Sequence, residues 1–177
     1  DEAFFHKIRR CHMHFGWGVG ANDVEQVLIG LCTLNLRYTS QDQVARGLAS
    51  FLQTQAEIAQ VLHPALQGSI GHAISHANWQ KTCNDKAAGI FSVIFKPEFT
   101  QAQIDTFCES LKLFKLGYSW AGPMSLVVPY NLSAMRHEWP AGVAPGHLVR
   151  FCIGLENAMD LQQDLAQALQ TLHARVS

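Results

Sequence analysis

The chain of 177 residues lacks an excess of charge of either sign, because 13 basic and 14 acidic residues leave a formal net charge of −1. Nucleic-acid-binding domains usually carry a basic patch, so we expect no nucleic-acid partner. The sequence also lacks an apolar run of the roughly 20 residues that a bilayer-spanning helix needs. Its longest apolar stretches, such as residues 125–129, are far shorter. We therefore expect no association with a membrane.

The sequence also lacks the marks of a secreted protein. The N-terminal Asp1-Glu2 does not have the order of basic and then apolar residues that a signal peptide shows. The five cysteines are odd in number and scattered along the chain, unlike a disulfide framework. We therefore expect five free thiols and a cytoplasmic location.

The chain does have apolar periodicity, which predicts alternating helices and strands. Asn22-Asp23 followed by Gln26, with Asp23 as the cap, indicates a helix start with a capping box. Thr100 followed by Gln103 is a second capping signal, and Asn157 is expected to cap the last helix. Apolar residues at helical spacing from Val24 to Leu52 predict one long helix or two abutting helices. Further helices are expected at residues 72–82, 100–111 and 157–172, and strands at residues 58–62, 89–95, 114–118, 126–128 and 148–153. These elements predict an α/β or α+β layer with helices covering one sheet face.

Arg150 lies within an apolar run at residues 148–153 and is the first candidate for a functional residue. In a strand, Leu148, Arg150 and Cys152 would share one face, and Val149, Phe151 and Ile153 the other. A half-buried guanidinium needs an anion. One hypothesis is a structural ion pair with one of the chain's 14 acidic residues. The other is a bidentate clamp on a ligand carboxylate, for which arginine suits better than lysine.

Four blocks, at residues 63–72, 89–92, 117–122 and 148–156, resemble in their order and spacing the C-terminal half of the Cys/Met-metabolism enzymes that use pyridoxal phosphate. The pair Ser119-Trp120 after Tyr118 is most similar to the pattern of cystathionine β-lyases. The resemblance implies the fold of type I pyridoxal-phosphate transferases. It assigns residues 1–40 to the end of the large cofactor-binding domain. Residues 41–177 would be the C-terminal small domain with its connecting helix, a small, mainly antiparallel sheet covered by helices.

The resemblance also implies an activity, α,β-elimination from cystathionine or a related sulfur-containing amino acid, with pyridoxal phosphate as cofactor. It places Arg150 on the substrate α-carboxylate, with Ser119 and Trp120 beside it. Tyr118 would lie near the distal part of the substrate, although a half-buried tyrosine at a strand end is the other interpretation. Enzymes of this family are homo-oligomers, so a dimer or tetramer is implied.

Departures from the family pattern set limits on this expectation. The family's cofactor-carrying lysine follows serine or threonine and precedes a glycine-histidine segment, and no lysine here has that neighbourhood. The lysines are Lys7, Lys81, Lys86, Lys96, Lys112 and Lys115. The phosphate-binding glycine loop and the aspartate for the pyridinium nitrogen are also unmatched. We therefore expect the C-terminal portion of such an enzyme, inactive alone, with no catalytic and no cofactor-binding residue of its own.

Two substitutions leave the substrate and the reaction type open. Ile29 stands where the family has an arginine, and Met124 where it has an acidic residue. A related trans-sulfuration enzyme of the cystathionine γ-synthase or γ-lyase type is therefore an alternative. Another alternative is a non-catalytic module that binds amino acids or supports oligomer contacts.

Residues of metal-binding type occur in two places. Cys11, His12 and His14 lie close together, and His72 and His76 are one helical turn apart. Neither group has the spacing of a full four-ligand set, so we expect no metal.

Overall fold

The computed structural model describes residues 1–16, 18–66, 72–135, 137–139 and 141–173. The chain forms two compact units, Asp1–Leu36 and Arg37–Ser177. Within the described residues no helix is both long and apolar enough to cross a membrane.

The first unit contains α1 (Glu2–Phe15) and α2 (Ala21–Cys32), and neither helix has a buried residue. The sequence did not predict α1, which begins where the Asp1 carboxylate accepts a hydrogen bond from the Ala3 amide at 2.9 Å. The predicted cap of α2 at Asp23 is wrong. The helix begins after Gly20, without a side-chain cap, and Asp23 lies in its first turn. A carboxylate there still favours the helix N-terminus electrostatically.

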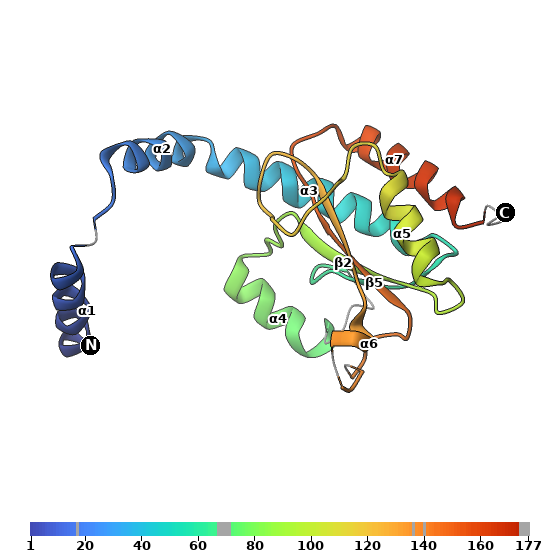
Figure 1. The fold of residues 1–177 in the computed structure, drawn as a ribbon, viewed down its shortest axis with the longest axis horizontal. Coiled ribbons are helices and arrows are strands. Elements are labelled where there is room, and N and C mark those ends of the chain that lie inside the picture. Colours follow the sequence, from blue (N-terminus) through green and yellow to red (C-terminus); the bar gives the residue numbers. More distant parts are fainter. Residues whose placement is uncertain (17, 67–71, 136, 140, 174–177) are drawn as a thin grey trace. The chain divides into compact units, whose positions relative to one another are not determined.

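The second unit is built on a five-stranded sheet (Figure 1). The sheet order is β1-β2-β5-β4-β3, in which β3 and β4 are parallel and the other neighbours antiparallel. The strands are β1 (Ile58–Leu62), β2 (Ile90–Phe95), β3 (Lys115–Leu116), β4 (Leu126–Tyr130) and β5 (His147–Cys152). The helices are α3 (Leu34–Gln53), α4 (His72–Cys83), α5 (Gln101–Ser110), α6 (Leu132–Met135) and α7 (Ala158–Thr171). The expected small, mainly antiparallel sheet is confirmed.

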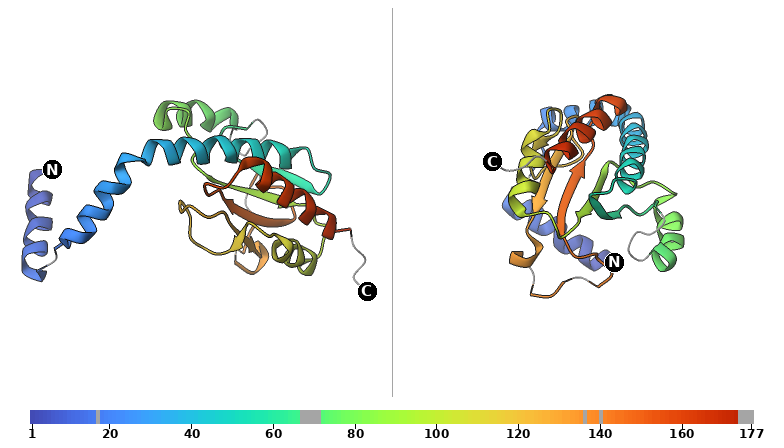
Figure 2. Two further views of the ribbon diagram at one scale, coloured as in Figure 1. Left: turned by 90° about the horizontal axis from the view of Figure 1, so that it is seen from above. Right: turned by 90° about the vertical axis from the view of Figure 1, so that its right-hand side faces the viewer.

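Helices α3, α5 and α7 cover one face of the sheet (Figure 2). Phe151 of β5 is fully buried at the centre of this core. Its ring lies 5.4 Å from the rings of Phe91 and Phe114, between centroids, and 6.5 Å from that of Phe107. The prediction of helices covering one sheet face is confirmed, and β5 is anchored through this aromatic cluster.

The helix caps of the second unit follow the sequence signals. Thr100 and Gln103 form the predicted capping box of α5, and the Asn157 side chain accepts hydrogen bonds at the start of α7. Helix α3 follows α2 after Thr33, so the prediction of two abutting helices is confirmed. All five cysteines are free, with Cys108 and Cys152 buried.

Strand β3 is shorter than the predicted strand at residues 114–118. The Asp164 carboxylate of α7 accepts hydrogen bonds from the backbone amides of Lys112, Leu113 and Phe114 at 2.8, 2.7 and 3.4 Å. Those amides are therefore not available to a strand ladder, and only Lys115–Leu116 pairs with β4.

Candidate carboxylate-binding site

Strand β5 has one face in the core and the other toward the candidate site. Val149 and Phe151 are fully buried beneath the helices. Arg150 points the other way and pairs in register with Ser92 of β2 and Val128 of β4. The alternation that the sequence predicted is confirmed, because a strand turns successive side chains to opposite faces.

The Arg150 guanidinium is held by backbone carbonyls. Its Nη2 donates to the carbonyl oxygen of Tyr118 at 2.8 Å and to that of Ser119 at 3.4 Å. Its Nε is buried and has no hydrogen-bond partner among the described residues. The three ion pairs of the described chain involve other residues, so the hypothesis of a structural ion pair for Arg150 is not supported there. Carbonyl oxygens accept hydrogen bonds from the guanidinium but do not neutralise its positive charge. This charge and the unpartnered Nε donor suit an anionic ligand.

Two tyrosines complete the surroundings of this side chain. The Tyr130 ring lies with its centroid 5.8 Å from the Arg150 Cζ, within the range of a cation–π contact. The Tyr118 ring packs edge-on against Tyr130 at 6.4 Å between centroids. Because the Tyr118 side chain is 76% exposed, the interpretation of a half-buried tyrosine at a strand end is wrong. Trp120 is also exposed.

The segment from Tyr118 to Ser125, which we call the site loop, is fixed to the sheet and to α3. The Ala121 amide donates to the Cys152 Sγ at 3.2 Å, and the Gln41 side chain donates to the Gly122 carbonyl at 2.9 Å. Ala121 has a positive φ of 63°, a conformation that costs energy for a residue with a Cβ. These bonds therefore hold the loop in a shape that its sequence does not favour by itself.

The Cys152 thiol on the same face as Arg150 is kept protonated. Burial raises its pKa, and the Ala121 amide and the Arg150 charge counter this only in part. The thiol therefore acts as a hydrogen-bond acceptor for the loop rather than as a nucleophile.

An apolar hollow lies along β3 and β4. It has a volume of about 320 Å³ and is lined by Leu116, Gly117, Tyr118, Val127, Val128 and Pro129. Val128 is the cross-strand partner of Arg150, and Tyr118 supplies one of its carbonyl acceptors.

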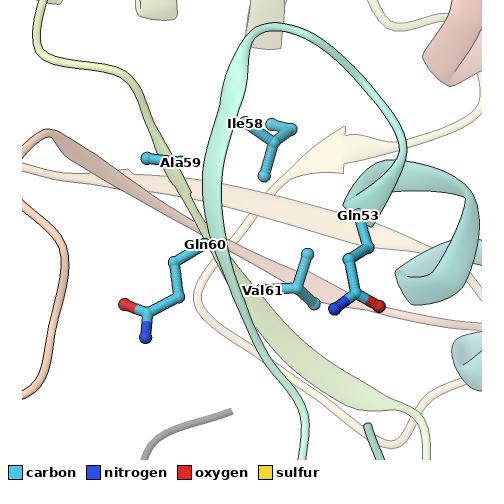
Figure 3. A pocket seen from close by; sticks show the side chains of 5 residues that line it. All are labelled: Gln53, Ile58, Ala59, Gln60 and Val61. Carbon is cyan, nitrogen blue, oxygen red and sulfur yellow. The ribbon is translucent and has the colours of Figure 1, made fainter. Parts of the chain in front are cut away.

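A second pocket, of about 120 Å³, lies between the end of α3 and β1 (Figure 3). Its lining residues are Gln53, Ile58, Ala59, Gln60 and Val61. None of these side chains is ionisable or nucleophilic, so the pocket offers no catalytic group.

The predicted site residues differ in how they lie relative to Arg150. The structure brings Tyr118 and Ser119 to Arg150 through their main chains, and it places Trp120 on the same loop. Sequence reasoning missed Tyr130 and the roles of Cys152 and Gln41. Alternation did place Cys152 on the Arg150 face, but Tyr130 becomes a neighbour only through the pairing of β4 with β5.

The metal hypotheses receive no support from the described residues, where no group of three histidine, cysteine or acidic residues is placed to hold an ion. Cys11, His12 and His14 lie in α1, so consecutive side chains turn away from one another. The side chain of His72 and residues 67–71 of the first resemblance block lie outside the described residues.

The arrangement around Arg150 fits a carboxylate better than it fits a pyridoxal phosphate. The residues that contact the guanidinium are Tyr118, Ser119 and Tyr130, which include neither a lysine for an imine nor an acid for a pyridinium nitrogen. The unpartnered Nε offers one more donor toward a single anion.

Comparisons with known proteins bear on the family of the chain. The family described as Cys/Met metabolism PLP-dependent enzyme matches residues 1–170. Cystathionine beta-lyase of Bordetella avium is 36% identical over 172 residues, which cover 96% of this chain and 41% of the relative. Cystathionine beta-lyase of Salmonella typhimurium is 36% identical over 142 residues, or 77% of this chain and 34% of the relative.

A solved structure of cystathionine gamma synthase from Xanthomonas oryzae pv. oryzae, in complex with cystathionine, superposes with a TM-score of 0.72 at 26% identity. The match covers 92% of this chain and 41% of that one. The chain therefore spans 34 to 41% of the length of these three proteins.

Proposed function

Because the chain belongs to the Cys/Met-metabolism family of pyridoxal-phosphate-dependent enzymes, we propose that it provides the substrate-carboxylate site of a carbon–sulfur β-lyase. Arg150 binds the α-carboxylate of a sulfur-containing amino acid through its free donor edge. The observation that carries the proposal is the buried Nε of Arg150, which has no partner among the described residues although the guanidinium is otherwise fixed.

The surrounding residues have separate parts in this proposal. The carbonyls of Tyr118 and Ser119 orient the guanidinium, and Tyr130 lies against it. Trp120 and the Tyr118 ring border the substrate from the exposed side of the site loop. When bound, pyridoxal phosphate supplies the electron sink for loss of the Cα proton and of the β-thiolate. The contribution of this chain is to bind the substrate and fix its orientation.

The two relatives at 36% identity that cover most of this chain are cystathionine beta-lyases, which supports β-elimination. A γ-type trans-sulfuration activity is a second candidate, because the solved neighbour is a cystathionine gamma synthase. Both candidates bind an amino-acid carboxylate, so the role of Arg150 is the same in each. Cystathionine and related sulfur amino acids are the proposed substrate class.

We further propose that residues 1–40 belong to a large cofactor-binding domain and residues 41–177 to the small domain. A cytoplasmic location and a homo-oligomeric assembly, dimer or tetramer, are part of the same proposal. The exposed apolar side chains of α1 and α2, including Phe4, Phe5, Val27 and Leu28, are consistent with burial in a larger assembly.

The carboxylate site can be tested on the chain itself by nuclear magnetic resonance. We expect S-methyl-L-cysteine to shift the Arg150 Nε–H signal in a saturable way, whereas its carboxamide, which lacks the charge, does not. Arg150→Ala lacks that signal, so its binding is followed at the backbone amides of residues 118–122. The substitution should weaken binding by roughly 10- to 100-fold, because it removes a charge-assisted contact. Arg9→Ala, at an exposed arginine of α1, should leave binding unchanged. Equal binding by wild type and Arg150→Ala would reject the proposal.

We also propose that none of the six lysines of this chain carries the cofactor. Pyridoxal phosphate is added, the mixture is treated with borohydride, and the intact mass is compared with that of the 19.6 kDa chain. We expect no site-specific adduct. A stoichiometric adduct on one lysine would overturn this part of the proposal and leave the test of Arg150 unaffected.

A further inference from the structure

Glu156, four residues beyond the end of β5, makes close contacts with the far end of the site loop. One carboxylate oxygen accepts the Ser125 amide at 2.7 Å, and the other accepts the Ser125 hydroxyl at 2.8 Å. Ser125 is fully buried, and its Oγ accepts a third hydrogen bond from the Gly154 amide at 2.9 Å. The amide and the hydroxyl of Ser125 therefore both have hydrogen-bond partners in the segment that follows β5.

The backbone of residues 154–155 packs closely against that of residues 123–124 beside this contact. The Leu155 amide donates to the Pro123 carbonyl at 2.8 Å. A Cβ on Gly154 would lie 2.3 Å from the Pro123 oxygen and 2.6 Å from the Met124 carbonyl carbon. Such distances exclude any side chain at Gly154, so the exit of β5 and residues 123–125 form one closely packed unit.

The site loop therefore has two fixed ends with different tasks. At its start, the carbonyls of Tyr118 and Ser119 hold Nη2 of Arg150. At its end, Ser125 is held by Glu156. The residue between them with a positive φ, Ala121, stores a strain that opposes this shape. Releasing the Ser125 end would leave the bonds of Ala121 and Gly122 to oppose this strain, and we expect the two carbonyls then to shift relative to the guanidinium.

We propose that Glu156 is a positioning residue for the carboxylate site. It holds the Ser125 end of the site loop so that the Tyr118 and Ser119 carbonyls stay on Nη2 of Arg150 and leave the unpartnered Nε to the ligand. This inference rests on the proposed function of Arg150. Glu156 is not a catalytic residue, since it acts only through Ser125 and the loop.

Glu156→Gln is the sharpest substitution because it keeps the shape of the side chain. Its amide group offers a donor where the Ser125 hydroxyl needs an acceptor, and Ser125 Oγ already accepts from Gly154. The hydroxyl proton is then buried without a partner. We expect the affinity for S-methyl-L-cysteine, followed at the Arg150 Nε–H signal, to fall on the order of tenfold.

Ser125→Ala supplies the second arm of the test. Without the hydroxyl, a glutamine at position 156 can still accept the amide of residue 125, so the conflict disappears. We expect Glu156→Gln to change affinity by less than about twofold in the Ser125→Ala background, which makes the two substitutions strongly non-additive. Additive effects, or an unchanged affinity in Glu156→Gln, would overturn the proposal.

Glu57→Gln is a matched control at the opposite edge of the sheet. Glu57 is a largely buried carboxylate that contacts His173 at 2.6 Å, just before β1. The Glu57→Gln substitution should lower the free energy of unfolding without weakening ligand binding. If Glu57→Gln lost as much affinity as Glu156→Gln, Glu156 would act only through the general stability of the fold. Failure of the wild-type chain to bind the ligand would instead reject the proposed function, so the two failures are distinguishable.

Discussion

The two faces of β5 place neighbouring residues in opposite environments. Val149 and Phe151 are fully buried against the helices, and the Phe151 ring contacts three other phenylalanines. Arg150, between them in sequence, is half-buried and donates to the carbonyls of an exposed loop. The core face thus fixes the strand, and the other face can hold a charged side chain whose contacts do not need to stabilise the fold.

The largest effect should come from the core face. Phe151→Ala removes the ring at the centre of the aromatic cluster, and we expect the free energy of unfolding to fall by ~3–5 kcal/mol. Urea denaturation measures this change. Leu148→Ala, at a half-buried position on the Arg150 face, is the control and should cost less than half as much. Equal losses would remove the distinction between the two faces.

Much of this contrast could be predicted from the sequence, because it is local. Alternation along residues 148–153 places Arg150 opposite Phe151, and the caps at Thr100 and Asn157 depend on residues within one turn. The predicted start of α2 was wrong because Gly20 and Asp23 both lie at possible helix starts. Only the folded chain shows that the helix begins directly after the glycine.

The contacts that hold the site could not be predicted in the same way. The bonds from Arg150 to Tyr118, from Ser125 to Glu156 and from Gln41 to Gly122 join residues 31 to 81 positions apart. Nothing in the local pattern specifies such pairs. The sequence also left the partner of Arg150 open, and the geometry favours the ligand because no ion pair of the described chain includes Arg150.

The next effect concerns a titratable group on the core side of the sheet. His63 is fully buried, packs against Phe91, and accepts the Ala65 amide through Nδ1. Burial, with a smaller contribution from the positive charge of Arg46, lowers the pKa of His63 from 6.5 to about 4. Because the folded pKa lies below the unfolded one, the contribution of His63 to stability is fully present above about pH 6.5 and is lost as the pH falls toward about 4.

We therefore expect the free energy of unfolding to fall by about 2 kcal/mol between about pH 6.5 and about pH 5 through His63 alone. Urea denaturation of wild type and His63→Gln at both pH values isolates this contribution as a difference. His137→Gln, at an exposed histidine, is the control and should behave as wild type. A fall of the same size in His63→Gln would show that other groups cause the pH dependence.

A smaller effect is expected at Tyr130, on the Arg150 face. Tyr130→Ala removes the ring beside the guanidinium, and a contact of this kind contributes about 0.5–1 kcal/mol at exposed sites. Tyr130→Phe keeps the ring and should be indistinguishable from wild type in urea denaturation. Broadening of the Arg150 Nε–H signal in Tyr130→Ala, but not in Tyr130→Phe, would show that the ring restricts the side chain. Identical spectra for both variants would show that it does not.

The most direct test of the central claim is the free energy of unfolding of Arg150→Ala, measured by urea denaturation. If Arg150 is kept for an external carboxylate, its removal loses only hydrogen bonds to loop carbonyls and the contact with the Tyr130 ring. The account then predicts a loss of about 2 kcal/mol or less. A loss of ~3–5 kcal/mol, the cost of breaking a buried ion pair, would contradict the account and assign Arg150 to the structure of the fold.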